Sequence, residues 1–104
     1  MTEKAKQYIQ ENYTKSNLSV EELCNYLNVS ATYFSVTFKK ETGMSFISYL
    51  TKIRLEQAKN LLDTTEEKSY MIAEKVGYTE ANYFSYVFKK HYGVSPSKYR
   101  STKG

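Results

Sequence analysis

The chain contains two copies of one segment, offset by 50 residues. When the sequence is compared with itself at this offset, nine of the 17 positions from 33 to 49 are identical to their counterparts. The residues of the first copy that recur are Tyr33, Phe34, Ser35, Phe38, Lys39, Lys40, Gly43, Ser45 and Tyr49. A match of this density predicts two copies of one supersecondary unit, and two copies are too few for a solenoid.

In the first copy, the pattern predicts two short helices joined by a tight turn. Ser19 and the glutamate three residues later form a capping box before a helix over about 20–27. Asn28 tolerates a left-handed backbone, which suits the turn. Ser30 is a good N-cap for the second helix, and Gly43 is expected to end it.

The second copy repeats this arrangement with different residues. Its first helix is predicted from three apolar positions, Ile72, Ala73 and Val76. Gly77 is expected to stop this helix and to form the turn. Thr79 is then expected to be the N-cap of the next helix, and Tyr78 the hydrophobic-staple residue, which precedes the N-cap and packs on the start of that helix. This helix is expected to end at Gly93.

Three further helices are predicted around the two copies. The segment from Glu3 to Tyr13 is amphipathic, and Ser45 begins a linker helix of roughly 17 residues. Ser95 and Pro96 begin a last short helix. The chain is therefore expected to be all-α, with seven helices.

These seven helices are expected to form two helix-turn-helix units joined by the long linker helix, within one domain of 104 residues. The first unit is predicted over about residues 4–44 and the second over about 67–101. The linker helix is predicted over about 45–63.

The second helix of a helix-turn-helix unit enters the major groove of DNA, so its outer face needs short hydrogen-bonding side chains without strong negative charge. The segments over about 31–42 and 80–92 meet this requirement. Their phenylalanines, Phe34, Phe38, Phe84 and Phe88, are expected in the core, and Tyr49 and Tyr99 are expected to pack the following helix onto each unit. The outer faces then carry Thr32, Ser35, Val36 and Lys39 in the first copy, and Asn82, Ser85, Tyr86 and Lys89 in the second.

A rigid linker would let one chain contact two successive major grooves, about 34 Å apart on one face of the duplex. The net charge of +4, from 15 basic and 11 acidic residues, suits an anionic partner. Candidate phosphate contacts lie at both ends of the two helices: Ser30, Lys39, Lys40, Thr79, Lys89 and Lys90. Double-stranded DNA is therefore the expected partner.

The second copy contains a specific series of motifs: Ile72-Ala73-Glu74-Lys75-Val76-Gly77-Tyr78, Tyr83-Phe84, Phe88-Lys89-Lys90, Gly93-Val94-Ser95-Pro96 and Tyr99-Arg100. On these residues the chain resembles the DNA-binding domain of the AraC/XylS family of transcription regulators, from about Lys4 to Arg100. The resemblance implies seven helices, with the third and sixth as recognition helices, and activation or repression of transcription. It also implies base contacts from Ala31, Thr32, Ser35, Val36, Ala81, Asn82, Ser85 and Tyr86.

The chain departs from this family at Val36 and Tyr86, where relatives often have arginine. The bidentate contact of arginine with guanine is then absent, which predicts a binding site richer in A and T at those steps. The tyrosine-rich character is similar to output domains of two-component response regulators in the family. The resemblance implies a sensor or receiver domain, which is expected to be absent from this chain, so the chain is expected to be either a fragment or a short stand-alone regulator. RNA polymerase is a further candidate partner.

Other classes of function find little support in the sequence. No nucleophile with a paired histidine, metal-ligand spacing or glycine-rich phosphate loop is evident, so no enzyme activity, metal or cofactor is expected. The single Cys24 stands where the second copy has Ala73, which predicts a buried small residue. A lone cysteine and the lack of a long apolar stretch indicate a reduced, cytoplasmic setting away from the membrane.

The alternative function is a helical protein-interaction module that has kept the fold and lost sequence readout. Weak base-reading residues such as Ala31, Val36 and Ala81 favour this alternative. RNA is a less suitable partner, because side chains do not easily enter the deep, narrow major groove of A-form RNA.

Overall fold

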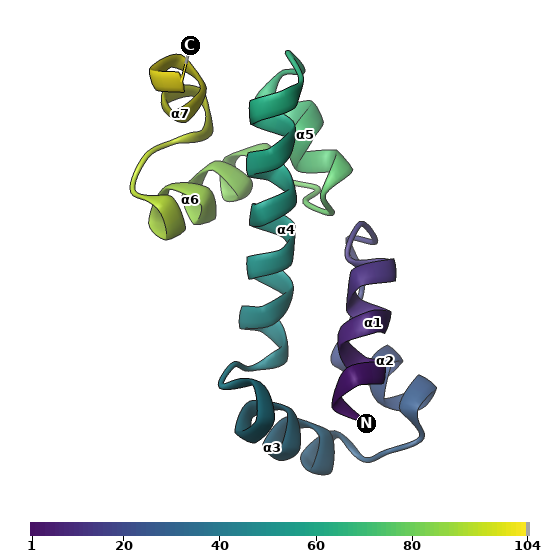
Figure 1. Ribbon diagram of the computed structural model, residues 1–104. Helices are drawn as coiled ribbons and strands as arrows, with labels where there is room; N and C mark the ends of the chain where they lie inside the picture. Colours follow the sequence, from purple (N-terminus) through teal and green to yellow (C-terminus); the bar gives the residue numbers. More distant parts are fainter. Residues whose placement is uncertain (104) are drawn as a thin grey trace. The chain divides into compact units, whose positions relative to one another are not determined.

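The structure, a computed structural model, describes residues 1–103, with the side chains of residues 1–102. This part of the chain contains seven helices and no strand, so the all-α prediction is confirmed (Figure 1). The helices are α1 (Thr2–Asn12), α2 (Val20–Leu27), α3 (Ala31–Thr42), α4 (Phe46–Thr64), α5 (Ser69–Lys75), α6 (Ala81–Tyr92) and α7 (Pro96–Lys103).

The chain divides into two compact units, and the boundary lies inside α4. Unit 1 comprises Met1–Ile53 and unit 2 begins at Arg54. Each unit contains one helix-turn-helix pair, α2 with α3 in unit 1 and α5 with α6 in unit 2. The linker helix α4 is 19 residues long, slightly longer than predicted, and the side chain of Ser45 accepts a hydrogen bond from the Ser48 N–H at its start.

The helix-turn-helix pair of unit 1 has the caps that the sequence predicts. Ser19 accepts a hydrogen bond from the Glu22 N–H, and Ser30 accepts one from the Tyr33 N–H, both at 3.1 Å. Asn28 adopts the left-handed conformation at φ 58°, as expected for the corner between α2 and α3. These three residues define where both helices begin and how the chain turns between them.

Only one half of the predicted capping box is present among the described residues. The carboxylate of Glu22 accepts hydrogen bonds from the Tyr8 hydroxyl at 2.5 Å and from Lys15 Nζ at 2.8 Å. It therefore ties α2 to α1 and to the preceding loop. The pKa of Glu22 is lowered, by the hydrogen bond from Lys15 first and by that from Tyr8 second.

An aromatic cluster forms the centre of unit 1. Phe34 and Phe38 are fully buried and stack with ring centroids 5.1 Å apart. Tyr49 on α4 meets Phe38 edge to face at 5.5 Å. The buried residues Ala5 and Ile9 of α1 belong to the same core, so α1 covers the helix-turn-helix pair.

The second turn corrects the sequence-based boundaries. Helix α5 ends at Lys75, so Val76 is the C-cap and does not lie in the helix. Gly77 has φ 103°, as the turn requires. Helix α6 begins after Glu80, so the N-cap is Glu80 and the prediction of Thr79 was wrong.

The reason for this error is that the two turns differ in length. In unit 1, two residues lie between the left-handed Asn28 and the first residue of α3, whereas unit 2 has three between Gly77 and the start of α6. Tyr78 therefore stands one residue further from the helix than a staple residue would. Its ring still packs on Phe84, with centroids 5.6 Å apart, so the apolar contact is kept.

The core of unit 2 repeats the aromatic arrangement of unit 1. Phe84 and Phe88 are fully buried, and Tyr99 on α7 meets Phe88 near edge to face at 6.0 Å. The predicted core role of all four phenylalanines and the packing role of Tyr49 and Tyr99 are confirmed.

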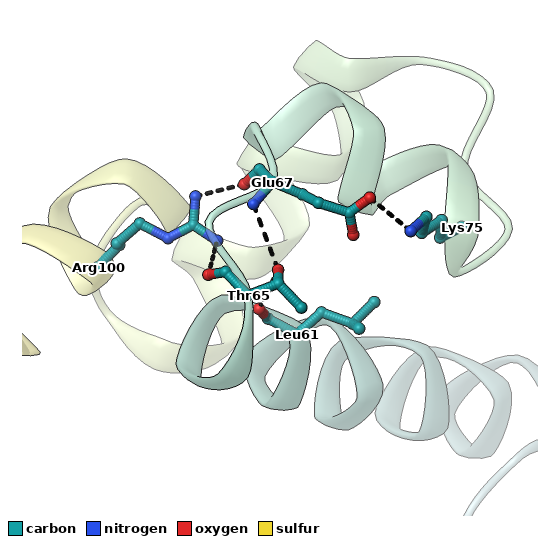
Figure 2. A network of polar contacts seen from close by, with 5 residues as sticks. All are labelled: Leu61, Thr65, Glu67, Lys75 and Arg100. Carbon is teal, nitrogen blue, oxygen red and sulfur yellow. Dashed lines mark hydrogen bonds and ion pairs between the residues drawn. The ribbon is translucent and has the colours of Figure 1, made fainter.

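A polar network closes unit 2 around Arg100 (Figure 2). The guanidinium donates hydrogen bonds to the backbone carbonyl oxygens of Leu62 at 3.5 Å, Thr65 at 3.1 Å and Glu67. The Glu67 carboxylate pairs with Lys75 Nζ at 2.5 Å. Arg100 thus joins α7 to the last turn of α4, where the helix leaves the Leu62 carbonyl unpaired, and to the loop that follows α4.

Candidate nucleic-acid interface

The outer face of α3 is exposed over its whole length. Phe34 and Phe38 are buried and fix the inner face of α3, so the residues on the opposite face of the helix point to solvent. The four predicted base-contact residues of this helix are all exposed: Ala31, Thr32, Ser35 and Val36. Val36 is 64% exposed, which is high for an apolar side chain in a folded domain.

The outer face of α6 has the same construction. Ala81, Asn82 and Tyr86 are exposed, and Ser85 is half-buried. Helix α6 therefore presents an amide, a hydroxyl and a phenol on one surface, groups that donate and accept the hydrogen bonds that base edges offer.

Positive charge lies at the C-terminal end of both helices. Lys39 and Lys40 occupy the last turn of α3, Lys89 and Lys90 occupy the last turn of α6, and all four are exposed. The Nζ of Lys90 lies 6.0 Å from the ring centroid of Tyr86. The two remaining candidates for phosphate contacts are also exposed, although the Ser30 hydroxyl already caps α3 and Thr79 lies in the turn before α6.

Two further tyrosines of these helices are exposed, although they are not among the predicted base contacts. Tyr33 is 54% exposed and Tyr83 is 57% exposed, each immediately before a buried phenylalanine. The recurrence of this tyrosine in both copies is the sequence feature that could have identified it. A residue that recurs beside a core position but stays exposed has a role other than packing the core.

A groove runs beside each of these helices, and the two grooves occupy equivalent places in the repeat. In unit 1 it lies between the start of α2, the middle of α3 and the start of α4, with a volume of about 430 Å³. In unit 2 it lies between the start of α5, the first half of α6 and helix α7, with a volume of about 590 Å³. No sequence pattern predicted either groove, since each draws its lining from three helices.

The single cysteine behaves as a core residue. Cys24 is 5% exposed, and burial raises the pKa of its thiol, which opposes formation of a reactive thiolate. Among the described residues, no cluster of histidine, cysteine or acidic side chains could hold a metal ion. None of the described helices combines the length and apolar character needed to cross a membrane.

Two helix-turn-helix pairs with buried phenylalanines and exposed polar second helices define the chain as a tandem helix-turn-helix domain. A family model described as "Helix-turn-helix domain" matches residues 23–102. The C-terminal domain of AraT, a response regulator from Geobacillus stearothermophilus, has a TM-score of 0.95 and 50% identity, covering 97% of this chain and 84% of that one. The C-terminal domain of the two-component response regulator yesN from Fusobacterium nucleatum has a TM-score of 0.91 and 45% identity, covering 94% and 95%.

A curated relative is the raffinose operon transcriptional regulatory protein RafR of Pediococcus pentosaceus, which is 42% identical over 93% of this chain and 35% of its own length. The chain belongs to the family of AraC-type helix-turn-helix domains. It spans about a third of the length of the curated relatives it matches.

Proposed function

We propose that this domain binds double-stranded DNA sequence-specifically and regulates transcription, with α3 and α6 as its recognition helices. The observation that carries the proposal is the repeated exposed polar face opposite each buried phenylalanine pair. A helix held by its inner face and free of acidic residues in its first turn is suited to insertion in the major groove. The role is binding, and no catalytic step is proposed.

In this proposal the base contacts come from the eight outer-face residues predicted above, and the four lysines at the helix ends contact phosphates. Asn82 is the side chain best suited to specific readout, because a carboxamide can bond adenine N6 and N7 together. Each unit supplies one recognition helix, and we propose that the two enter successive major grooves. Footprinting tests this arrangement: protection should cover two major grooves on one face of the duplex.

The whole protein is proposed to be a regulator in which this domain acts as the output part. The similarity to C-terminal domains of response regulators supports this assignment, and RNA polymerase is a proposed further partner. Fusing the domain to a receiver domain of such a relative and measuring phosphorylation-dependent transcription from a selected site tests it. Transcription that ignores the receiver would contradict it.

The primary experiment is selection from a random DNA library at moderate salt, followed by measurement of affinity for the enriched site. An enriched motif is expected, with A or T at the steps facing Val36 and Tyr86. The double variant Asn82→Glu/Ser85→Glu should lose binding, because two carboxylates would face the bases and phosphates. A motif with an obligatory G at both steps would contradict the predicted preference.

A matched control makes this test independent of overall charge. Ser16→Glu/Asn17→Glu changes the same residue types by the same charge at exposed positions in the loop before α2. It should retain binding, and both double variants should keep the helical circular dichroism of the parent. If the α6 variant binds DNA as the parent does, the alternative of a protein-interaction module is favoured instead.

A further inference from the structure

The grooves beside α3 and α6 occupy equivalent places in the repeat, and the groove of unit 2 has the more polar lining. In unit 1 the groove is lined by Leu18, Val20, Phe46 and Ile47, with three serines among them. The groove of unit 2 keeps Tyr70 and Ala81 in its lining, but it has Ser69 and Ser97 where unit 1 has Val20 and Ile47, and it adds the cationic Lys68 and Arg100. The two linings are therefore suited to different ligands.

Equivalent positions show how complete the exchange is. Ile47, the second residue of α4, is 65% exposed, and its counterpart in α7 is Ser97. The N-cap of α2 is Ser19, whereas the N-cap of α5 is Lys68. The groove of unit 2 thus gains a cation and hydroxyl groups at positions where unit 1 offers a hydroxyl and methyl groups.

Lys68 is a poor residue for the position it occupies. A lysine side chain cannot accept the hydrogen bond that an N-cap should accept, and its charge is unfavourable at the N-terminal end of a helix. Helix α5 accordingly has no side-chain cap hydrogen bond. Lys68 is exposed, and it forms no ion pair with any side chain that the structure describes. Local stability therefore does not explain this lysine.

The groove also borders the recognition helix itself. Asn82 and Ser85 of the base-reading face belong to its lining. The major groove is only about 12 Å wide, so side chains directly beside an inserted helix face the sugar-phosphate strand that bounds it. A cation and several hydroxyl groups are the donors that phosphate oxygens accept.

We propose that the groove of unit 2 binds a phosphate of the DNA backbone, with Lys68 supplying the charge and Ser69 and Ser97 the hydroxyl donors. The apolar groove of unit 1 makes no such contact, so unit 2 contributes more of the salt-dependent affinity. This inference rests on the proposed DNA binding, and it adds a phosphate site that differs between the two units. Arg100 does not bind the phosphate itself, because its guanidinium is held by backbone carbonyls; it positions α7 against the loop that leads to Lys68.

The test is the dependence of the dissociation constant on potassium chloride for the selected DNA, with three variants beside the parent. Lys68→Ala should make the negative slope of log affinity against log salt shallower by about 0.9, the value for one phosphate contact, without changing the preferred sequence. Lys4→Ala removes the same charge from an exposed position in α1 and should leave the slope close to that of the parent. Ile47→Lys should steepen the slope, since it places a cation in the equivalent groove.

Thermal unfolding separates a binding role from a structural one. Lys68→Ala should leave the unfolding temperature unchanged or raise it, because a residue unfavourable at an N-cap is removed. A parental slope in Lys68→Ala, or a slope change matched by Lys4→Ala, would overturn the phosphate site while DNA binding stands. An unchanged slope in Ile47→Lys would also contradict it, and failure of the parent to select any DNA would overturn the proposed function itself.

Discussion

Unit 1 and unit 2 share the interior of a helix-turn-helix pair and differ in the polar side chains that support it. In both, the second helix of the pair buries two phenylalanines, and one of them meets a tyrosine from the helix that follows. Before the pair, unit 1 has α1 and unit 2 has the second half of α4, which includes the buried Leu55, Ala58 and Leu62. After the pair, the start of α4 and helix α7 occupy equivalent places, and unit 2 adds the Arg100 network. The aromatic contact is therefore common to both units, whereas the polar contacts that support the pair are particular to each one.

The comparison extends to single positions. Arg100 stands where the repeat has Leu50, which is buried in the core of unit 1. Tyr92 at the end of α6 packs on Phe88 at 4.7 Å, while Thr42 at the end of α3 donates a hydrogen bond to the Phe38 carbonyl. Unit 2 thus uses aromatic and guanidinium groups at places where unit 1 uses a smaller polar residue and a leucine.

The largest effect is expected from the central phenylalanines. Phe38→Ala and Phe88→Ala should each lower the free energy of unfolding by about 3–5 kcal/mol, because each leaves a cavity in a closed core. Phe88→Ala should cost more, since Phe88 contacts three rings, those of Phe84, Tyr92 and Tyr99, and Phe38 contacts two. Urea unfolding followed by circular dichroism measures both.

The extra ring can be removed as a control. In a Tyr92→Thr background, which imitates Thr42 of unit 1, the cost of Phe88→Ala should fall toward that of Phe38→Ala. An equal cost for the two phenylalanines in the parent would show that the third ring adds nothing to the core of unit 2.

Arg100 should account for the next largest effect. Arg100→Met should lower the free energy of unfolding by about 1.5–3 kcal/mol, the range for hydrogen bonds to a charged group, because three backbone carbonyls lose their donor. Arg100→Lys should recover little, since one ammonium group cannot reach all three as the planar fork does. Lys98→Met, at an exposed position of the same helix, is the control for lost charge. Full recovery of stability by Arg100→Lys would show that the positive charge, and not the geometry of the guanidinium, stabilises unit 2.

The starts of α3 and α6 offer a smaller test of the same comparison. The Ser30 side chain accepts a capping hydrogen bond at the start of α3, whereas the Glu80 side chain forms no such bond at the start of α6. Glu80→Ser should therefore raise the free energy of unfolding by about 1 kcal/mol, and Ser30→Ala should lower it by a similar amount. Thermal unfolding of both variants checks this, and a destabilised Glu80→Ser would mean that Glu80 has a structural role beyond its backbone.

The features that depend on nearby residues could be predicted from the sequence, and those that depend on how helices pack could not. The aromatic core could be predicted because identical residues recur at helical spacing, and caps such as Ser19 and Ser30 could be predicted because they act within three residues. The extra residue after Gly77 could not, because turn length depends on how two helices cross. The grooves could not either, since residues from three helices line each one.

The predicted base and phosphate contacts divide in the same way. Exposure of the outer faces follows from periodicity once the phenylalanines are buried, so it was accessible from the sequence. The half-buried state of Ser85 depends on α7 passing nearby, as the shared groove lining indicates. The sequence does not single out Lys68, because Lys68 belongs to neither α3 nor α6 and lies outside the recurring residues.

The smallest expected effect concerns the hydrogen bonds that tie α1 to α2, a feature of unit 1. Because Lys15 and Tyr8 lower the pKa of Glu22 in the folded state, the ionised form stabilises folding above the ordinary glutamate pKa. This contribution is lost as the pH falls through the lowered pKa, so acid should weaken the tie. The carboxyl carbon of Glu22, followed by NMR from neutral to acid pH, should titrate below its usual range. Lys15→Met should move the pKa of Glu22 back toward that range more than Tyr8→Phe does, since Lys15 contributes the larger share. The opposite order would place the main contact on α1 and make that helix the principal source of the shift.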